Sequence, residues 1–251
     1  MGEFSKLKIF TIPALALFAT TAGCDLTGQY EPKFKQALEV SNRRSAFDAL
    51  LHQPYTDVVD STRQPIGVKL RLPKVFDGDS KVLPQTAIQG LTDIQGSAYT
   101  LMKDLDDDSG QKSACIVQIV AVPKAAQKGE PIQATITKLA TTLVPGAKWE
   151  DVLLPSPSGQ QQTLKRMHLD KQMPLLNDKG GGKMVPGLID IYEVDAGANV
   201  VVIAWVAMKP QAQKHNLERA IEASMGSVEV AGAPGGDAGG GAGGKTASGC
   251  F

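Results

Sequence analysis

The histidines are the side chains of this 251-residue chain that would most readily bind a transition metal, and there are three: His52, His168 and His215. They lie far apart in the sequence, and no HxH, HExxH or CxxC spacing accompanies them. His168 alternates with Arg166 and Asp170 along a predicted strand, which is typical of a solvated polar face. We therefore predict no metal site and no cofactor. Whether the fold assembles a site from these histidines and dispersed carboxylates stays open.

An acidic segment has the spacing of the first half of a calcium loop. Asp104, Asp106 and Asp108 alternate as in an EF-hand, which also requires Gly at the sixth place and Glu at the twelfth. This chain has Ser109 and Cys115 at those places. A turn between two strands is therefore favoured over a calcium site.

Other catalytic patterns are incomplete. The run Gly180-Gly181-Gly182-Lys183 lacks both the first glycine and the hydroxyl residue of a phosphate loop. No GxSxG elbow occurs, and Cys115 lies in an apolar run that predicts a buried thiol. Trp149 and Trp205 are interpreted as packing residues rather than as the lining of a pocket. We assign no catalytic or cofactor-binding residues and predict that the chain is not an enzyme.

Cys24 is the one residue that we assign to a chemical modification. It follows a short charged segment and the 12-residue apolar run Ile9–Thr20, which is shorter than the about 20 residues of a bilayer span and is typical of a secretory signal. Ala22-Gly23-Cys24 resembles a lipobox, the motif at which bacterial lipoproteins are cleaved and acylated, although Thr21 stands where that family usually has Leu. The resemblance implies that residues 1–23 are a signal peptide and that Cys24 carries diacylglycerol and an acyl chain such as palmitate. The alternatives are cleavage by an ordinary signal peptidase and a buried helix of a cytosolic protein.

Charge and composition restrict the partners. The 26 basic and 26 acidic residues give a formal net charge of zero, whereas nucleic acid or an acidic membrane surface favours a basic excess. We therefore expect no nucleic-acid partner, attachment to a membrane through lipid on Cys24, and a protein partner of unknown identity. The expected location is the cell envelope, and Asp25 favours the inner membrane if enterobacteria-like sorting applies.

Hydropathy divides the rest of the chain into three parts. Residues 24–64 are expected to hold the lipidated N-terminus, a linker and a helix over Pro32–Leu51, with Pro32 at the first helical position. Residues 65–230 have the alternation of strands and the periodicity of helices, and we expect them to form one domain. Residues 231–251 include nine glycines and are predicted to be disordered.

Seven strands and two helices are predicted in the domain. Short turns between successive strands imply antiparallel pairing, and the helices must cover the apolar faces of the sheet. Ile136, Leu139, Leu217 and Ile221 are expected to be buried, whereas Lys69 and Arg71 lie on the wet face of the first strand. The predicted strands are 65–72, 98–105, 114–122, 149–154, 163–170, 187–194 and 199–208, and the helices are 130–143 and 210–225.

This order of elements resembles the α/β/α sandwich of the PsbP-like family, whose best-known members are extrinsic subunits of photosystem II. The segments that carry the resemblance are GVKLRLP, SAYTLMKDLDDDSG, NVVVIAWVAMKP and the following helix with MGSV. It implies an α+β fold, with a mainly antiparallel sheet of about six to seven strands flanked by helices, over residues 65–230.

Two hypotheses about function follow from these observations. The first is a non-enzymatic, membrane-tethered envelope lipoprotein that binds another protein or assists assembly of a complex. The second is a small-ligand-binding or enzymatic lipoprotein with a site built from dispersed residues. A flat surface with an exposed apolar patch would favour the first, and a deep pocket with converging His, Asp or Arg would favour the second.

Overall fold

The computed structural model describes residues 26–59, 65–78, 80–83, 97–127, 130–174 and 184–230. Cys24, the expected signal peptide and residues 231–251 lie outside this range. The chain divides into two units at Glu39–Val40, within helix α1 (Leu26–Leu50). The second unit, from Val40 onwards, holds both sheets and the remaining helices, and it begins upstream of the residue 65 at which we expect the domain to start.

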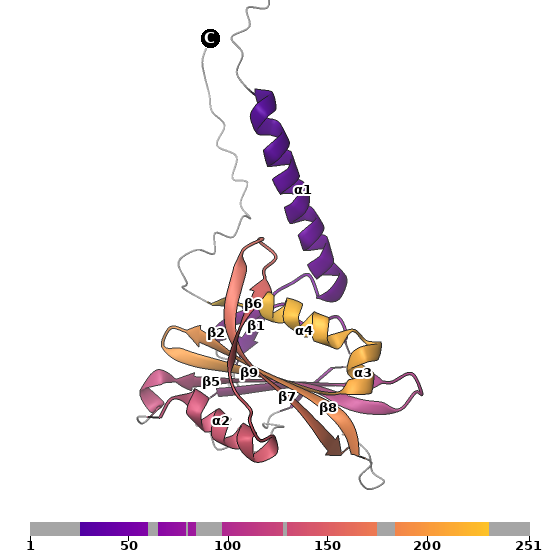
Figure 1. Ribbon diagram of the computed structural model, residues 1–251, viewed down its shortest axis with the longest axis vertical. Helices are drawn as coiled ribbons and strands as arrows, with labels where there is room; N and C mark the ends of the chain where they lie inside the picture. The colour runs from indigo at the N-terminus through magenta and orange to yellow at the C-terminus, as the bar shows by residue number, and fades with distance from the viewer. Residues whose placement is uncertain are drawn as a thin grey trace, which may run out of the picture. The chain divides into compact units, whose positions relative to one another are not determined.

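A seven-stranded antiparallel sheet forms the centre of the second unit (Figure 1). Each of its pairings is antiparallel, so the predicted α+β class and the predicted strand pairing are confirmed. Six of its strands match predicted ones. The order across the sheet is β3 (Lys81–Leu83), β4 (Ser97–Asp106), β5 (Lys112–Pro123), β9 (Asn199–Met208), β8 (Met184–Ala196), β7 (Gln161–Pro174) and β6 (Glu150–Pro155).

Helices cover both faces of this sheet. On one face, Ile132, Ile136 and Ala140 of α2 (Ile132–Leu143) pack on apolar side chains of β5, β7, β8 and β9. The opposite face carries α3 (Lys209–Lys214) and α4 (Leu217–Gly226), as Figure 1 shows. Burial is confirmed for Ile136, and also for Leu217 and Ile221, but Leu139 is only half-buried, because the contact stripe of α2 follows every fourth residue.

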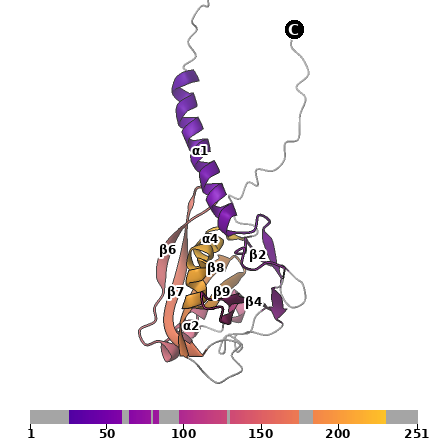
Figure 2. The same cartoon turned by 90° about the vertical axis from the view of Figure 1, so that its right-hand side faces the viewer.

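The first predicted strand belongs to a second sheet, which corrects the expectation of a single one. β2 (Pro65–Leu70) pairs with β1 (Thr56–Val59) and β10 (Glu229–Val230), two short strands that we did not predict. In the turned view of Figure 2, β2 lies next to α4, and the buried residues of the two elements share one core. The small sheet therefore helps to cover the face of the main sheet that carries α3 and α4.

The expected final helix, Pro210–Met225, is in fact two helices. The break falls at His215 and Asn216, and Asn216 has a φ of 50°, in the left-handed region. Asn tolerates this conformation better than most residues, so it redirects the chain without a glycine. A short 3₁₀ turn, η2 (Lys124–Ala126), follows β5.

Helix α1 is confirmed as a helix but begins at Leu26 rather than at Pro32. Pro32 lies inside it, where it lacks the amide hydrogen that other interior residues donate. In the second unit, Phe47 and, just after the helix, Leu51 are buried together with Ala223 of α4. The C-terminal end of α1 is therefore an integral part of the domain.

Candidate functional site

The three histidines lie in three separate places. His52 Nε2 is 3.2 Å from the carbonyl oxygen of Phe76, and His215 Nε2 is 3.0 Å from the carbonyl oxygen of Asp106. His168 belongs to a different cluster on the main sheet. Among the residues described, no group of three or more His, Cys, Asp and Glu side chains is arranged to hold a metal ion.

The acidic segment forms the turn between β4 and β5. The carboxylate of Asp107 accepts hydrogen bonds of 2.9 Å from the backbone N–H groups of Ser109 and Gln111. Asp106 accepts a 2.7 Å hydrogen bond from Lys214 of α3, and this bond is the main reason that the pKa of Asp106 is lowered. These carboxylates stabilise the turn and attach α3 to it. The glycine run at residues 180–183 lies outside the described residues.

His168 joins two strands and a helix. Its Nδ1 is 2.8 Å from the buried carboxylate of Asp190 on β8, and its Nε2 is 3.2 Å from Asp170. Asp170 also accepts a hydrogen bond from Lys209 of α3, at 2.8 Å. Burial raises the pKa of Asp190, against the opposing effect of the hydrogen bond with His168. Since both ring nitrogens face carboxylates, His168 links β7 to β8 and to the Lys209–Asp170 pair.

Cys115 and the two tryptophans are packing residues, as expected. Cys115 is a free, buried thiol, and burial raises its pKa, so it stays protonated and unreactive. Trp205 is buried with its ring centroid 5.9 Å from that of Phe76. The indole N–H of Trp149 donates a 3.0 Å hydrogen bond to Thr137 of α2.

A buried arginine holds the end of α1 in the second unit. Arg71 is only 4% exposed, which corrects the expectation that it faces solvent. Its guanidinium donates to Asp48 Oδ1 at 2.6 Å and to the carbonyl oxygen of His52 at 2.7 Å. Its backbone N–H donates to Ser227 Oγ at 2.9 Å, and its carbonyl oxygen accepts from Ser224 Oγ at 2.7 Å. Arg71 thereby links the end of α1 to the end of α4.

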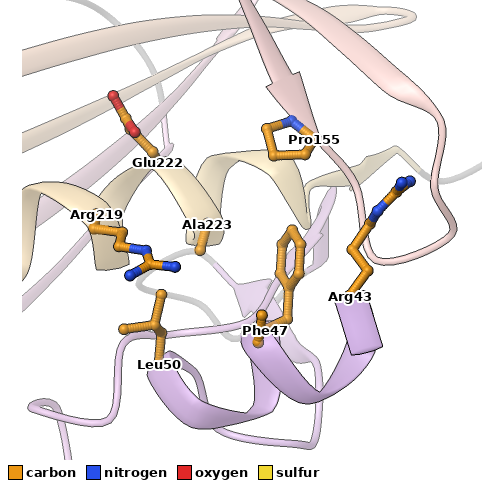
Figure 3. Close-up of a pocket in the computed structure, with 8 residues that line it drawn as sticks. Arg43, Phe47, Leu50, Pro155, Arg219, Glu222 and Ala223 are labelled. Carbon is orange, nitrogen blue, oxygen red and sulfur yellow. The ribbon is translucent and has the colours of Figure 1, made fainter. Parts of the chain in front are cut away.

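A groove of about 230 Å³ lies between the second half of α1 and α4 (Figure 3). We call it the α1–α4 groove. Its surface is mainly apolar, and the ring of Phe47 points between Ala223 and Pro155. The residues that line it are Arg43, Ala46, Phe47, Leu50, Pro155, Arg219, Glu222 and Ala223.

One glycine brings β6 close to α4 at this groove. A Cβ atom at Gly226 would lie 2.1 Å from the carbonyl oxygen of Pro155, so only glycine permits this approach. The carbonyl belongs to the backbone and cannot move aside as a flexible side chain would. Gly226 therefore sets the distance between α4 and the Pro155 side of the groove.

Charged residues stand around the apolar surface. Figure 3 shows Arg219 and Arg43 on either side of the Phe47 ring. Glu222 is 3.6 Å from Arg166 of β7, which also donates a 2.7 Å hydrogen bond to Glu150. In the described part of the chain, neither Arg43 nor Arg219 forms an ion pair. The sequence did not reveal the groove, because α1 and α4 meet only in the tertiary structure.

The comparisons with known proteins give no family and no function. No family model matches this chain, and no curated protein matches it. Two solved structures resemble parts of it: a protein from Bacteroides thetaiotaomicron VPI-5482, and a protein of unknown function from Pseudomonas aeruginosa described as a putative regulator. The first is 10% identical with a TM-score of 0.34, and the match covers 65% of this chain and 45% of that protein. The second is 11% identical with a TM-score of 0.30, and the match covers 61% and 88%.

No helix among the described residues combines the length and the hydropathy that a membrane span requires.

Proposed function

We propose that this protein is an envelope lipoprotein, tethered through lipid on Cys24, that binds a partner protein through the α1–α4 groove. The groove carries the binding part of the proposal. It has an apolar surface and charged edges, as protein-binding sites commonly have. The tether rests on the lipobox-like residues before Cys24.

The size of the groove favours a protein partner over a small molecule. Pockets for drug-sized ligands measure about 300–1,000 Å³. The α1–α4 groove, at about 230 Å³, is smaller, and its volume suits one large apolar side chain. Its one lining carboxylate, Glu222, faces Arg166, and no histidine is among its lining residues, so these residues favour binding over acid–base chemistry.

The fold proposal is a PsbP-like sandwich. Its support is the antiparallel sheet with α2 on one face and α3 and α4 on the other, together with the order of these elements along the chain. This proposal concerns the fold and not the function, because one fold serves many functions. An experimental structure superposed on a PsbP-like domain tests it. The same strand order across the sheet supports the proposal, and a different order overturns it.

The binding proposal is tested by photocrosslinking in intact cells. A photoreactive amino acid is placed at Ala46, which lines the groove, or at Lys138 on the exposed side of α2 as a matched control. We expect one defined adduct from position 46, identified by mass spectrometry, that is absent from position 138. A second substitution, Ala223→Arg, fills the groove and should abolish the adduct; because Ala223 is buried, a urea melt of this variant shows that the domain is still folded. An adduct that persists with Ala223→Arg, or equal labelling from both positions, overturns the proposal.

The tether is tested by mass spectrometry and fractionation. The mature protein should have an acylated N-terminal Cys24, and Cys24→Ser should release it from membranes. A chain that still begins at Met1, or one that stays membrane-bound after the substitution, contradicts the proposal.

A further inference from the structure

We infer that the α1–α4 groove recognises an acidic peptide segment in which one large apolar side chain is flanked by Asp or Glu. This inference rests on the proposed protein-binding function and specifies the chemistry of the partner. Two features support it: the charged residues at the edge of the groove and the apolar residues that line it.

The charges around the groove do not balance. Arg43, Arg219 and Glu222 are its three charged lining residues. Arg166 of β7 is shared between Glu222 and Glu150, so these three residues together keep one negative charge, which offsets only one of the two arginines at the groove. The guanidinium groups of Arg43 and Arg219 have no carboxylate partner among the residues that the structure describes. The groove therefore presents uncompensated positive charge to a partner.

Arg43 and Arg219 lie on opposite sides of the groove. They come from different helices, and Figure 3 shows the apolar surface around Phe47 between them. A segment that crosses the groove with its apolar side chain over Phe47 brings its neighbouring residues towards Arg43 on one side and Arg219 on the other. Planar guanidinium groups bind carboxylates through paired hydrogen bonds, so Asp or Glu on both sides of the apolar residue fits this arrangement.

The apolar part of the groove favours a large apolar side chain in the partner. It consists of the Phe47 ring with Leu50, Ala223 and Pro155. A large aromatic or aliphatic side chain gains more from such a surface than a small one does, and residues of this kind supply most of the binding energy in protein interfaces. The two arginines then contribute mainly to specificity and to the rate of association.

The inference is tested by selection from a random displayed peptide library. The bait is the full chain carrying Cys24→Ser, and selection is repeated with the same chain carrying Ala223→Arg, which fills the groove. Because Ala223 is buried, a urea melt first establishes that this variant is folded, and Ala46→Trp, at an exposed lining position, is a second groove-filling variant. Enriched peptides should carry Phe, Trp, Leu or Ile between acidic residues, and the filled groove should not enrich them. A selection without this pattern overturns the inference.

Variants of the two arginines test the charge directly. The probe is the most enriched peptide, labelled with fluorescein, and fluorescence anisotropy gives its Kd. Arg219→Glu and Arg43→Glu should each weaken binding at least about tenfold. Arg44→Glu is the matched control, because Arg44 is the neighbour of Arg43 on α1, is exposed and does not line the groove. Its effect should stay below about twofold.

The remaining outcomes separate the inference from the proposed function. Binding that ignores both arginines but is lost with Ala223→Arg overturns the acidic partner and leaves the protein-binding groove. Dodecanoate is also tested below its critical micelle concentration. If it displaces the peptide, and the selected peptides are not enriched in acidic residues, the groove is a fatty acid site and the inference is overturned. Dimerisation that Ala223→Arg abolishes identifies a second copy of the chain as the occupant and also overturns it.

Discussion

Replacement of Arg71 by methionine should destabilise the domain far more than replacement of a nearby exposed lysine. Arg71→Met keeps most of the aliphatic volume but removes the guanidinium that donates to Asp48 and to the carbonyl oxygen of His52. The Arg71 side chain is 5% exposed and that of Asp48 is 31% exposed. Breaking a buried ion pair by removing one partner typically costs about 3–5 kcal/mol. Because water can partly hydrate Asp48 in the variant, we expect a loss near the lower end, at about 3 kcal/mol.

The control is an ion pair of the same kind in the same region. Lys69 of β2 is 3.3 Å from Asp57 of β1, and their side chains are 48% and 61% exposed. Exposed pairs contribute little, so Lys69→Met should cost under about 1 kcal/mol. Both variants are compared by urea denaturation of the full chain carrying Cys24→Ser, followed by the fluorescence of its tryptophans.

A double-mutant cycle isolates the pair itself. Asp48→Asn alone should cost about 2 kcal/mol, because it weakens a charged hydrogen bond. The double variant with Arg71→Met should cost less than the sum of the two single changes, with a coupling of about 1–3 kcal/mol. An Arg71→Met variant no less stable than Lys69→Met, or additive effects of the changes at positions 71 and 48, would contradict this role of the ion pair.

Three further outcomes follow from burial and close contacts. Ile136→Ala should cost about 2–5 kcal/mol in urea denaturation, whereas Lys138→Ala, on the exposed side of the same helix, should cost under about 0.5 kcal/mol; equal midpoints would show that α2 does not cover the sheet. Gly226→Ala should lower stability by about 1–3 kcal/mol through its clash with a backbone carbonyl, while Gly78→Ala, with no atom within 4 Å of the new Cβ, should change it by less than about 0.5 kcal/mol. In a variant whose other two cysteines are serines, Cys115 should react with a thiol reagent only after unfolding, and rapid labelling of the native chain would contradict its burial.

The local elements of the main sheet could be predicted because each has its own periodicity. β9 matches its predicted range at both ends, and β5 matches within two residues, because long apolar strands bounded by turn residues give a clear pattern. The side of α2 that is buried was predicted only in part. Ile132, Ile136 and Ala140 of the predicted stripe are buried, whereas its other two members, Leu139 and Leu143, are half-buried and exposed. β1, β3 and β10 have two to four residues each, too few for any periodicity.

The contacts of Arg71 that link the end of α1 to the end of α4 could not be predicted from the sequence. Arg71 continues the alternation of β2, so the pattern placed it on the wet face together with Lys69. The tertiary structure instead buries it, because Asp48 and the carbonyl oxygen of His52 can both accept hydrogen bonds from its guanidinium. Whether an arginine is buried depends on acceptors from other elements, and the residue's own segment does not contain that information.

The sequence alone determined the α+β class, the antiparallel pairing of successive strands, the buried face of α4 and part of that of α2, because these follow from hydrophobic periodicity and short turns within contiguous segments. The tertiary structure decided which sheet β2 joins, where the last helix breaks and how α1 meets α4. It also created the α1–α4 groove, since Arg43 and Arg219 approach one apolar surface from helices far apart in the chain. Such a surface depends on contacts between distant segments, whereas periodicity reports only which side of one segment avoids water.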